Sequence, residues 1–252
     1  MQPRRRSSYP EPAIDWMVPA PGSRVLDVGS GSGAFAAMID RAGHRVCCVD
    51  SNPDRVRRIA ARLPTGLHTV AQAESLPFAS ESFDVVTVGE SVTRFAPGLA
   101  LAEFARVLRP GGHLAVVFNT RDDTVPWVKR LARLLQSEDP TAMRGDYGTE
   151  TVAALDESPY FPEVEEKSFR NWMPIDRNGL LQMVRSRPAL AGLQTERLAE
   201  LLDQVGALYD ASARPPEPLL LPFQATCRRA LVDHTELTMP VSEDGLRISM
   251  RF

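Results

Sequence analysis

Cysteine and histidine are scarce in this chain of 252 residues, which has three cysteines and four histidines. Cys47, Cys48 and Cys227 are odd in number and lack the spacing of a disulfide framework or a metal site. None of the histidines has another histidine four residues away, a spacing that zinc sites use. The sequence therefore predicts free cysteines in a reducing, cytoplasmic setting, and no metal site.

Long apolar runs and an excess of charge are also missing. A bilayer span needs roughly 20 apolar residues, and no run approaches that length. The arginines at positions 4–6 are not followed by the apolar stretch of a signal peptide. The net charge of −3 does not favour a nucleic-acid binder, which concentrates basic residues on one face. We expect a soluble protein with neither a membrane span nor a nucleic-acid partner, either a monomer or a homodimer.

What the chain does contain is alternating strand and helix patterns. Apolar runs predict strands at 24–28, 44–50, 67–70, 83–88 and 113–118, with helical patterns between most of them and a turn at 109–112. This alternation is typical of a doubly wound, Rossmann-like α/β fold with a mostly parallel sheet. After Asn119 the pattern changes to a helix at 127–135, a loop-like stretch at 136–162, a strand at 164–172, helices at 176–185 and 195–209, and a last strand at 219–232.

The stretch from Val25 to Gly33 joins the first strand to a helix through a glycine cluster. Glycines let the backbone turn sharply and approach a ligand closely, which is typical of a nucleotide-type cofactor site. However, the spacing of Gly29, Gly31 and Gly33 departs from the G-x-G-x-x-G of dinucleotide sites. Asp27 stands where those sites have an apolar residue, and a carboxylate there suits an amine-bearing cofactor. Asp50 ends the second strand, where acidic residues commonly accept hydrogen bonds from ribose.

These residues resemble the first motif of class I S-adenosylmethionine-dependent methyltransferases. The resemblance continues through Asp50 and through residues 71–78, 83–86 and 108–114, and is strongest over residues 22–120. Together these motifs are similar to the quinone-biosynthesis (UbiE-like) branch, in the methyltransferase type 11 family. The resemblance implies a seven-stranded sheet with an antiparallel last strand, S-adenosyl-L-methionine as cofactor and S-adenosyl-L-homocysteine as product.

The same resemblance implies a set of cofactor-binding residues. They are Asp27, Gly29, Ser30, Gly31, Gly33, Asp50, Ser51, Gln72, Ala73, Glu74, Gly89 and Glu90. Gln72 departs from the family, which usually carries an aspartate there to accept from the adenine amino group. An amide oxygen can still accept, although more weakly than a carboxylate.

Candidate residues on the acceptor side are Tyr9, Arg121 and Trp127. An aromatic ring such as Tyr9 would attract a sulfonium by a cation–π interaction. Arg121 could bind a carboxylate acceptor, or it could pair with a neighbouring aspartate at the surface. Trp172 either lines the acceptor pocket or packs in the core. The acceptor is expected to be a small molecule, and the sequence does not say whether oxygen, nitrogen or carbon is methylated.

Methyl transfer from a sulfonium is an in-line substitution, so the protein mainly has to position the reactants and exclude water. We expect one methyltransferase domain over 1–252, with a cofactor-binding core at 22–120, a largely helical acceptor-side insertion at 121–215, the last strand at 216–232 and a tail at 233–252. Two alternatives stay open: a relative that binds the cofactor without catalysis, and an NAD(P)-dependent oxidoreductase.

Overall fold

The computed structural model describes residues 9–122, 124–140, 142–143, 149–214, 216, 218–235 and 237. The arginine cluster at 4–6 and most of the predicted tail at 233–252 lie outside the described residues. None of the described helices is both long enough and apolar enough to cross a membrane.

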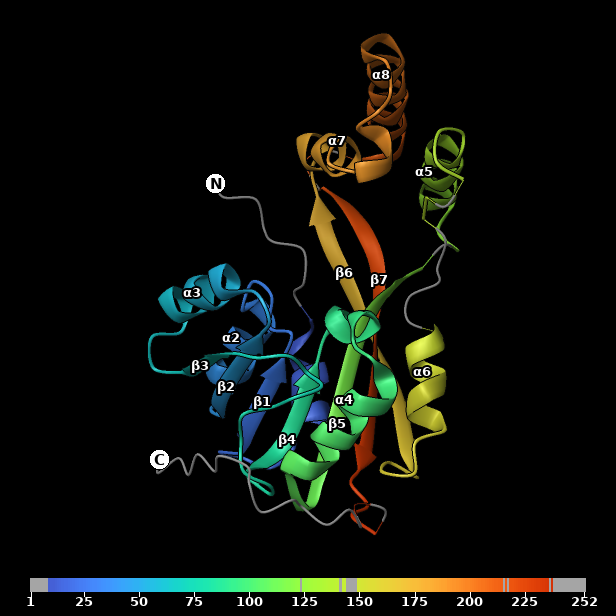
Figure 1. Ribbon diagram of the computed structural model, residues 1–252. Helices are drawn as coiled ribbons and strands as arrows, with labels where there is room; N and C mark the ends of the chain where they lie inside the picture. The colour runs from blue at the N-terminus through green and yellow to red at the C-terminus, as the bar shows by residue number, and fades with distance from the viewer. Residues whose placement is uncertain are drawn as a thin grey trace. The chain divides into compact units, whose positions relative to one another are not determined.

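The sheet has seven strands in the order β3-β2-β1-β4-β5-β7-β6 (Figure 1). The strands are β1 (Arg24–Val28), β2 (Arg45–Asp50), β3 (Leu67–Val70), β4 (Phe83–Val88), β5 (Leu108–Arg121), β6 (Val164–Ile175) and β7 (Leu219–Leu231). Strands β1 to β5 pair in parallel. The last strand, β7, runs antiparallel, since Asp122 next to β5 bonds to Pro222 while Val232 bonds back to Gly112. This confirms the predicted Rossmann-like sheet.

Eight α-helices accompany the sheet in the described part of the chain. They are α1 (Glu11–Met17), α2 (Ala34–Arg41), α3 (Pro53–Arg62), α4 (Pro97–Val107), α5 (Pro126–Gln136), α6 (Thr149–Asp156), α7 (Arg177–Arg185) and α8 (Thr195–Ser212), with short 3₁₀ turns η1 (Glu90–Arg94) and η2 (Pro188–Leu190). Helix α3 begins at Pro53, because the Asn52 side chain caps it by accepting the N–H groups of Asp54 and Arg55.

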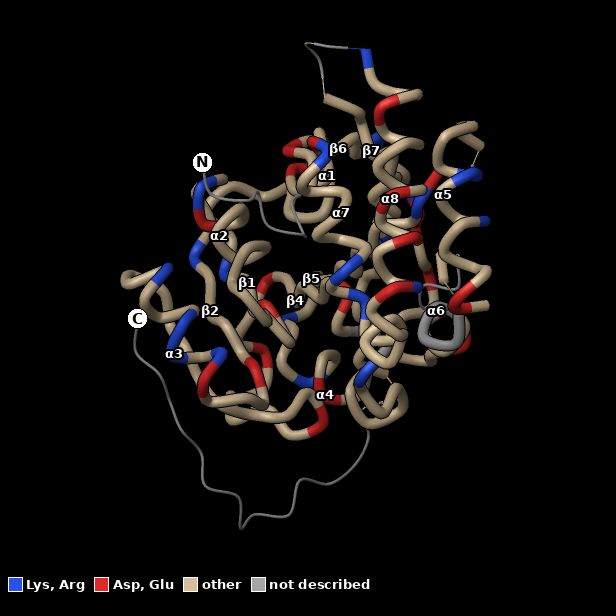
Figure 2. Tube along the Cα trace, turned by 90° about the horizontal axis from the view of Figure 1, so that it is seen from above, with Lys and Arg blue, Asp and Glu red and all other residues tan. Residues whose placement is uncertain are grey.

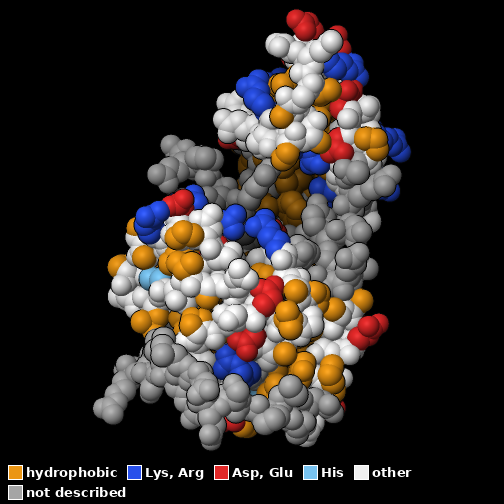
Figure 3. All heavy atoms as spheres, viewed as in Figure 1, with side chains coloured by type: hydrophobic (Ala, Val, Ile, Leu, Met, Phe, Trp, Pro, Cys, Tyr) orange, Lys and Arg blue, Asp and Glu red, His pale blue; other side chains and the backbone are white. Residues whose placement is uncertain are grey.

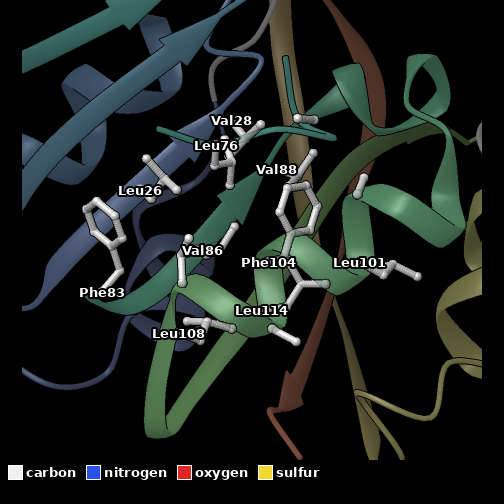
Figure 4. Packing of buried hydrophobic residues seen from close by; sticks show 14 of the residues in the cluster. Leu26, Val28, Leu76, Phe83, Val86, Val88, Leu101, Phe104, Leu108 and Leu114 are labelled. Atoms are coloured by element: carbon white, nitrogen blue, oxygen red, sulfur yellow. The ribbon is translucent and has the colours of Figure 1, made fainter. Parts of the chain in front are cut away.

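Two hydrophobic clusters cover the two faces of the sheet, because successive residues of a strand point to opposite sides. Leu26 and Val28 of β1 pack on one face with Phe83 and Phe104 (Figure 4). Val25 packs on the other face. The central strands are therefore buried on both faces, as their continuous apolar runs predict.

The neighbours Cys47 and Cys48 of β2 follow the same rule, one in each cluster. All three cysteines are free and buried. Burial raises the pKa of Cys47 and of Cys227 to about 12, and it also raises the pKa of Cys48. These thiols are small core side chains rather than nucleophiles.

One predicted strand boundary and one predicted loop were wrong. The fifth strand begins at Leu108 rather than at position 113, because the glycine turn at 109–112 is absorbed as a register shift against β4, with Gly111 at φ +76°. The predicted loop at 136–162 contains helix α6. In the described half of that helix, Leu155 is the one large apolar residue that is fully buried. The helix therefore has only a weak periodic pattern of apolar residues.

The chain divides into two compact units. The sheet unit comprises residues 5–119, 147–169 and 225–252, and the helical unit comprises residues 120–146 and 170–224. The helical unit has its own core, in which α5, α7 and α8 contribute Leu131, Val184 and Val205. This is the predicted helical insertion after the fifth strand. That the two units form one methyltransferase domain stays a prediction.

Candidate cofactor site

A pocket of about 620 Å³ lies at the carboxyl ends of β1 and β4 in the sheet unit. The two strands are paired in register from Val25↔Val85 to Val28↔Val88, so the loops that follow them meet at the same edge. The predicted residues that line this pocket are Tyr9, Asp27, Gly29, Ser30, Gly31, Gly89 and Glu90. The sheet topology thus brings together residues that are up to 81 positions apart, from Tyr9 to Glu90.

The backbone of the glycine loop is left-handed at Gly29, Gly31 and Gly33, with φ values of +69°, +57° and +69°. A Cβ atom on Gly29 would lie 2.6 Å from Cβ of Ser91 and 3.0 Å from the ring of Phe95. Ser91 is fixed there, because its hydroxyl donates to the backbone oxygen of Val28 over 3.2 Å. Gly29 is therefore required both by its φ angle and by the loop that follows β4.

Asp27 is the only predicted pocket residue with a fully buried carboxylate oxygen that lacks a partner among the described residues. The side chain is 1% exposed, and its other oxygen, Oδ1, accepts the hydroxyl of Thr87 over 3.2 Å. Burial raises the pKa of Asp27 to about 7, against the lowering effect of its hydrogen bonds. A buried oxygen without a donor costs free energy, so Asp27 suits a ligand that brings an N–H group to it.

Asp50 is buried next to this pocket and supports the glycine loop. Its Oδ2 accepts the N–H of Gly31 over 3.0 Å, and its Oδ1 accepts the N–H of Asn52 over 2.9 Å. Arg55 lies 3.6 Å from the same Oδ1. Asp50 does not line the pocket, and neither do Gly33 and the exposed Ser51.

The residues predicted to hold the adenine side also lie outside the pocket lining. Gln72 forms a bridge with Ser75, Ala73 is buried, and Glu74 accepts the N–H of Ala96 over 2.7 Å. These contacts shape the loop rather than aim its side chains into the pocket.

A clamp from α4 holds the end of that loop. Glu103 accepts the N–H of Leu76 over 2.7 Å, while Arg106 donates to the backbone oxygens of Phe78 and Leu76. Burial works against ionisation, but hydrogen bonds from Arg106 and Leu76 lower the pKa of Glu103. The i, i+3 spacing of these two residues on a helix is the one sequence signal that could have revealed the clamp.

Tyr9 lies in the wall of the pocket, packed edge-on against Phe35 with 5.1 Å between the ring centroids. It is 3% exposed, and burial followed by the charges of Glu90 and Asp27 raises its pKa well above the usual value. Glu90 is exposed and accepts from Asn119 over 3.4 Å. The ring of Tyr9 is thus a neutral, rigid side of the pocket.

Sequence reasoning missed the arginines that line the pocket. Arg55, Arg58 and Arg62 lie along one face of α3, at the i, i+3 and i+7 spacing that marks such a face, and Arg94 adds a fourth. Figure 2 shows the blue segments on α3. Among the described residues, no group of three His, Cys, Asp or Glu side chains could hold a metal ion.

The acceptor-side candidates Arg121 and Trp127 lie in the helical unit. The guanidinium of Arg121 donates to the backbone oxygen of Met143 over 2.6 Å. Its neighbour Asp122 accepts the N–H of Thr124 over 3.0 Å. Trp127 lines a separate cavity within the helical unit, described below.

Comparison with known proteins decides the family. A family model for a methyltransferase domain matches residues 26–116. Over 235 residues the chain is 33% identical to an uncharacterized methyltransferase of Mycobacterium tuberculosis, and the match covers 90% of each protein. This chain belongs to the methyltransferases. The methyltransferase is also 30% identical over 160 residues to a demethylmenaquinone methyltransferase of Beutenbergia cavernae, with 63% of each chain covered.

The fold agrees with that of solved methyltransferases. A protein described as a type II methyltransferase of Anaeromyxobacter dehalogenans superposes with a TM-score of 0.64 at 24% identity, over 91% of this chain and 97% of that one. The enzyme is an S-adenosylmethionine-dependent methyltransferase. This excludes the NAD(P)-dependent oxidoreductase. The orphaned oxygen of Asp27 fits an amine-bearing cofactor.

Proposed function

We propose that this methyltransferase transfers the methyl group of S-adenosylmethionine to a small-molecule acceptor by in-line substitution. We place the cofactor in the pocket lined by the glycine loop, Tyr9 and Glu90. The observation that carries the placement is Asp27 Oδ2, which is buried, lines the pocket side of β1 and has no donor among the described residues. The cofactor's amino group is such a donor, and an ionised Asp27 would pair with it.

We assign the other predicted residues by their places around the pocket. Gly29, Ser30 and Gly31, with Gly33 behind them, form the turn against which the cofactor would lie. Asp50 would accept from ribose hydroxyls with the lone pairs that Gly31, Asn52 and Arg55 leave free. Ser51 and the loop Gln72-Ala73-Glu74 would border the adenine, and Gly89 and Glu90 would border the methionine end.

The bound cofactor supplies an activated methyl group, so this chain has to orient it and exclude water. Tyr9 serves this role in the proposal, because its ring is buried, rigid and uncharged next to two carboxylates. The face of an aromatic ring near a sulfonium contributes roughly 0.5–2 kcal/mol of cation–π attraction.

Two observations support a small acceptor. The two cavities of about 620 and 520 Å³ have the size of small-molecule sites. The face seen in Figure 3 mixes Lys and Arg with Asp, Glu and hydrophobic side chains, whereas nucleic-acid binders concentrate basic charge. The three free cysteines are consistent with the cytoplasm, where we expect the enzyme to work. We retain Arg121 and Trp127 as acceptor-side residues.

Calorimetric titration with S-adenosylhomocysteine tests the cofactor pocket. We expect binding to the wild type, a loss of at least tenfold in affinity in Asp27→Ala and Asp50→Ala, and no change in Asp54→Ala, whose side chain is exposed on α3. A folded wild-type protein that binds neither cofactor form would overturn the proposal. Transfer of a labelled methyl group into a cell extract then separates an enzyme from a non-catalytic cofactor binder.

A further inference from the structure

The helical unit contains a cavity of its own, with a volume of about 520 Å³. Its walls come from the start of α5, from β6, from the end of α8 and from the start of β7. Residues that line it include Trp127, Trp172, Arg214, Leu219 and Leu220. All of them belong to the helical unit, so the cavity does not depend on the sheet unit.

The walls of this cavity are apolar and partly open to water. Trp172 and Leu220 are each 44% exposed, and both are among the large hydrophobic side chains that the described residues leave exposed. Exposed apolar side chains that cluster in one hollow commonly mark a ligand site. The two tryptophans supply flat surfaces, which suit a planar ligand.

The Trp172 ring is held in place by a cation. The guanidinium of Arg170 lies 4.9 Å from the ring centroid, within the distance of a cation–π contact. This contact fixes the ring and adds positive charge beside the cavity.

Arg214 is the only residue with a full charge among the described residues that line the cavity. Among the residues that the structure describes, no ion pair joins Arg214 to a carboxylate. A guanidinium at the rim of an apolar cavity binds a carboxylate, sulfonate or phosphate through a charge-assisted hydrogen bond. The charge of the cavity thus complements an anion.

We propose that this cavity binds a small, flat, apolar molecule that carries one anionic group. Its rings lie against Trp127 and Trp172, and its anionic group pairs with Arg214. The second step of the proposal rests on the proposed function. In this step the ligand of the cavity is the methyl acceptor, an aromatic or polyunsaturated acid.

The probe for the test is anilinonaphthalene sulfonate, a planar apolar anion whose fluorescence rises on binding. N-phenylnaphthylamine has nearly the same rings and no charge, so the pair separates ring contact from charge contact. We expect Arg214→Gln to weaken binding of the sulfonate about tenfold and to leave binding of the neutral amine within about twofold. Trp172→Ala is expected to weaken both.

A matched variant controls for indirect effects. Arg130→Gln removes an exposed arginine of α5 that does not line the cavity. Near-ultraviolet circular dichroism verifies that each variant is folded, because the sulfonate also binds partly unfolded proteins. Equal sulfonate binding by Arg214→Gln and Arg130→Gln would overturn the proposal, as would unchanged binding of both probes by Trp172→Ala.

Cofactor binding is measured on the same variants. S-adenosylhomocysteine is expected to bind Arg214→Gln as it binds the wild type. If the proposed cofactor pocket is wrong, the wild type does not bind S-adenosylhomocysteine; if the proposal for this cavity is wrong, only the sulfonate result differs from expectation. With labelled methyl donor and a cell extract, Arg214→Gln is expected to label less of the acidic, extractable product. Undiminished labelling would assign the cavity to a ligand other than the acceptor and overturn the second step.

Discussion

Gly31 donates its backbone N–H to Oδ2 of Asp50 over 3.0 Å, so the glycine loop after β1 is tied to the acid at the end of β2. The parallel register that pairs Val28 with Val49 places the two strand ends side by side. Asp50 therefore has a structural role that is independent of any ribose. Two of its hydrogen bonds are made by backbone donors, which cannot rotate away if the acid is changed.

Asp50→Asn is expected to destabilise the protein. Whichever way the new amide is oriented, its NH₂ group faces the N–H of Gly31 or of Asn52, so one buried donor loses its acceptor. The free energy of unfolding should fall by about 1–3 kcal/mol, measured by urea denaturation without cofactor. Asp54→Asn, in an exposed pair with Arg57, should cost no more than about 0.5 kcal/mol. Equal stabilities of the two variants would refute a structural role for Asp50.

Gly29→Ala and Gly22→Ala form a matched pair, since both glycines have a φ of +69°. A Cβ on Gly22 has no atom within 4 Å, whereas a Cβ on Gly29 would collide with Ser91. In Gly22→Ala the free energy of unfolding should therefore fall only by the strain of a left-handed alanine, about 1–2 kcal/mol. In Gly29→Ala the free energy of unfolding should fall by about 1–3 kcal/mol more, and S-adenosylhomocysteine should bind at least tenfold more weakly. The measurements are thermal unfolding and calorimetry.

The affinity for S-adenosylhomocysteine should depend on pH through Asp27, whose pKa burial raises to about 7. Below that pH the carboxyl is protonated and cannot pair with the ammonium of the ligand. Affinity should therefore rise up to tenfold per pH unit as the pH approaches 7, and level off above it. In Asp27→Asn this rise should vanish, leaving weak binding at every pH. A wild-type affinity that is constant from about pH 5.5 to 7.5 would show that Asp27 does not pair with the ligand's amino group.

The stability of the cofactor-free protein should change with pH in the opposite sense. Since the pKa of Asp27 is about 7 in the native state and 3.8 is its usual value, the native state holds the extra proton between those limits. The free energy of unfolding attributable to Asp27 is thus greatest below the lower limit and falls as the pH rises to about 7. Asp27→Asn should be relatively more stable at pH 8 than at pH 5, by roughly 3 kcal/mol, because about two pH units of the shift lie above pH 5. Urea denaturation of both proteins at the two pH values measures the difference.

The strands of the sheet unit were predictable where an apolar run ends in a turn. The bounds of β3 and β4 agree with the sequence prediction to the residue. The start of β5 was not predictable, because Arg109–Gly112 has the composition of a free turn. It becomes part of a strand only because Leu108 before it and His113 after it both pair with β4. Helix α6 was missed because its pattern carries little amphipathic signal.

The candidate site was predictable where a local motif carries it. The glycine loop and Asp27 were found from seven consecutive residues. Ser91 and the arginines of α3 were not, since their positions depend on which strands are neighbours and on how helices pack. That Asp50 supports the loop could not be read from its position at the end of β2, because the partner is a backbone N–H of another strand's loop.

The burial of Cys47, Cys48 and Cys227 turns these thiols into reporters of structural opening. A thiol reagent in water can reach them only when the surrounding elements separate, and their high pKa values suppress reaction until then. Because Cys47 and Cys48 point to opposite faces of the same strand, peptide mapping of the modified residues would time the exposure of each face separately. The order in which Cys47 and Cys48 react would thus show which of the two hydrophobic clusters separates from the sheet first.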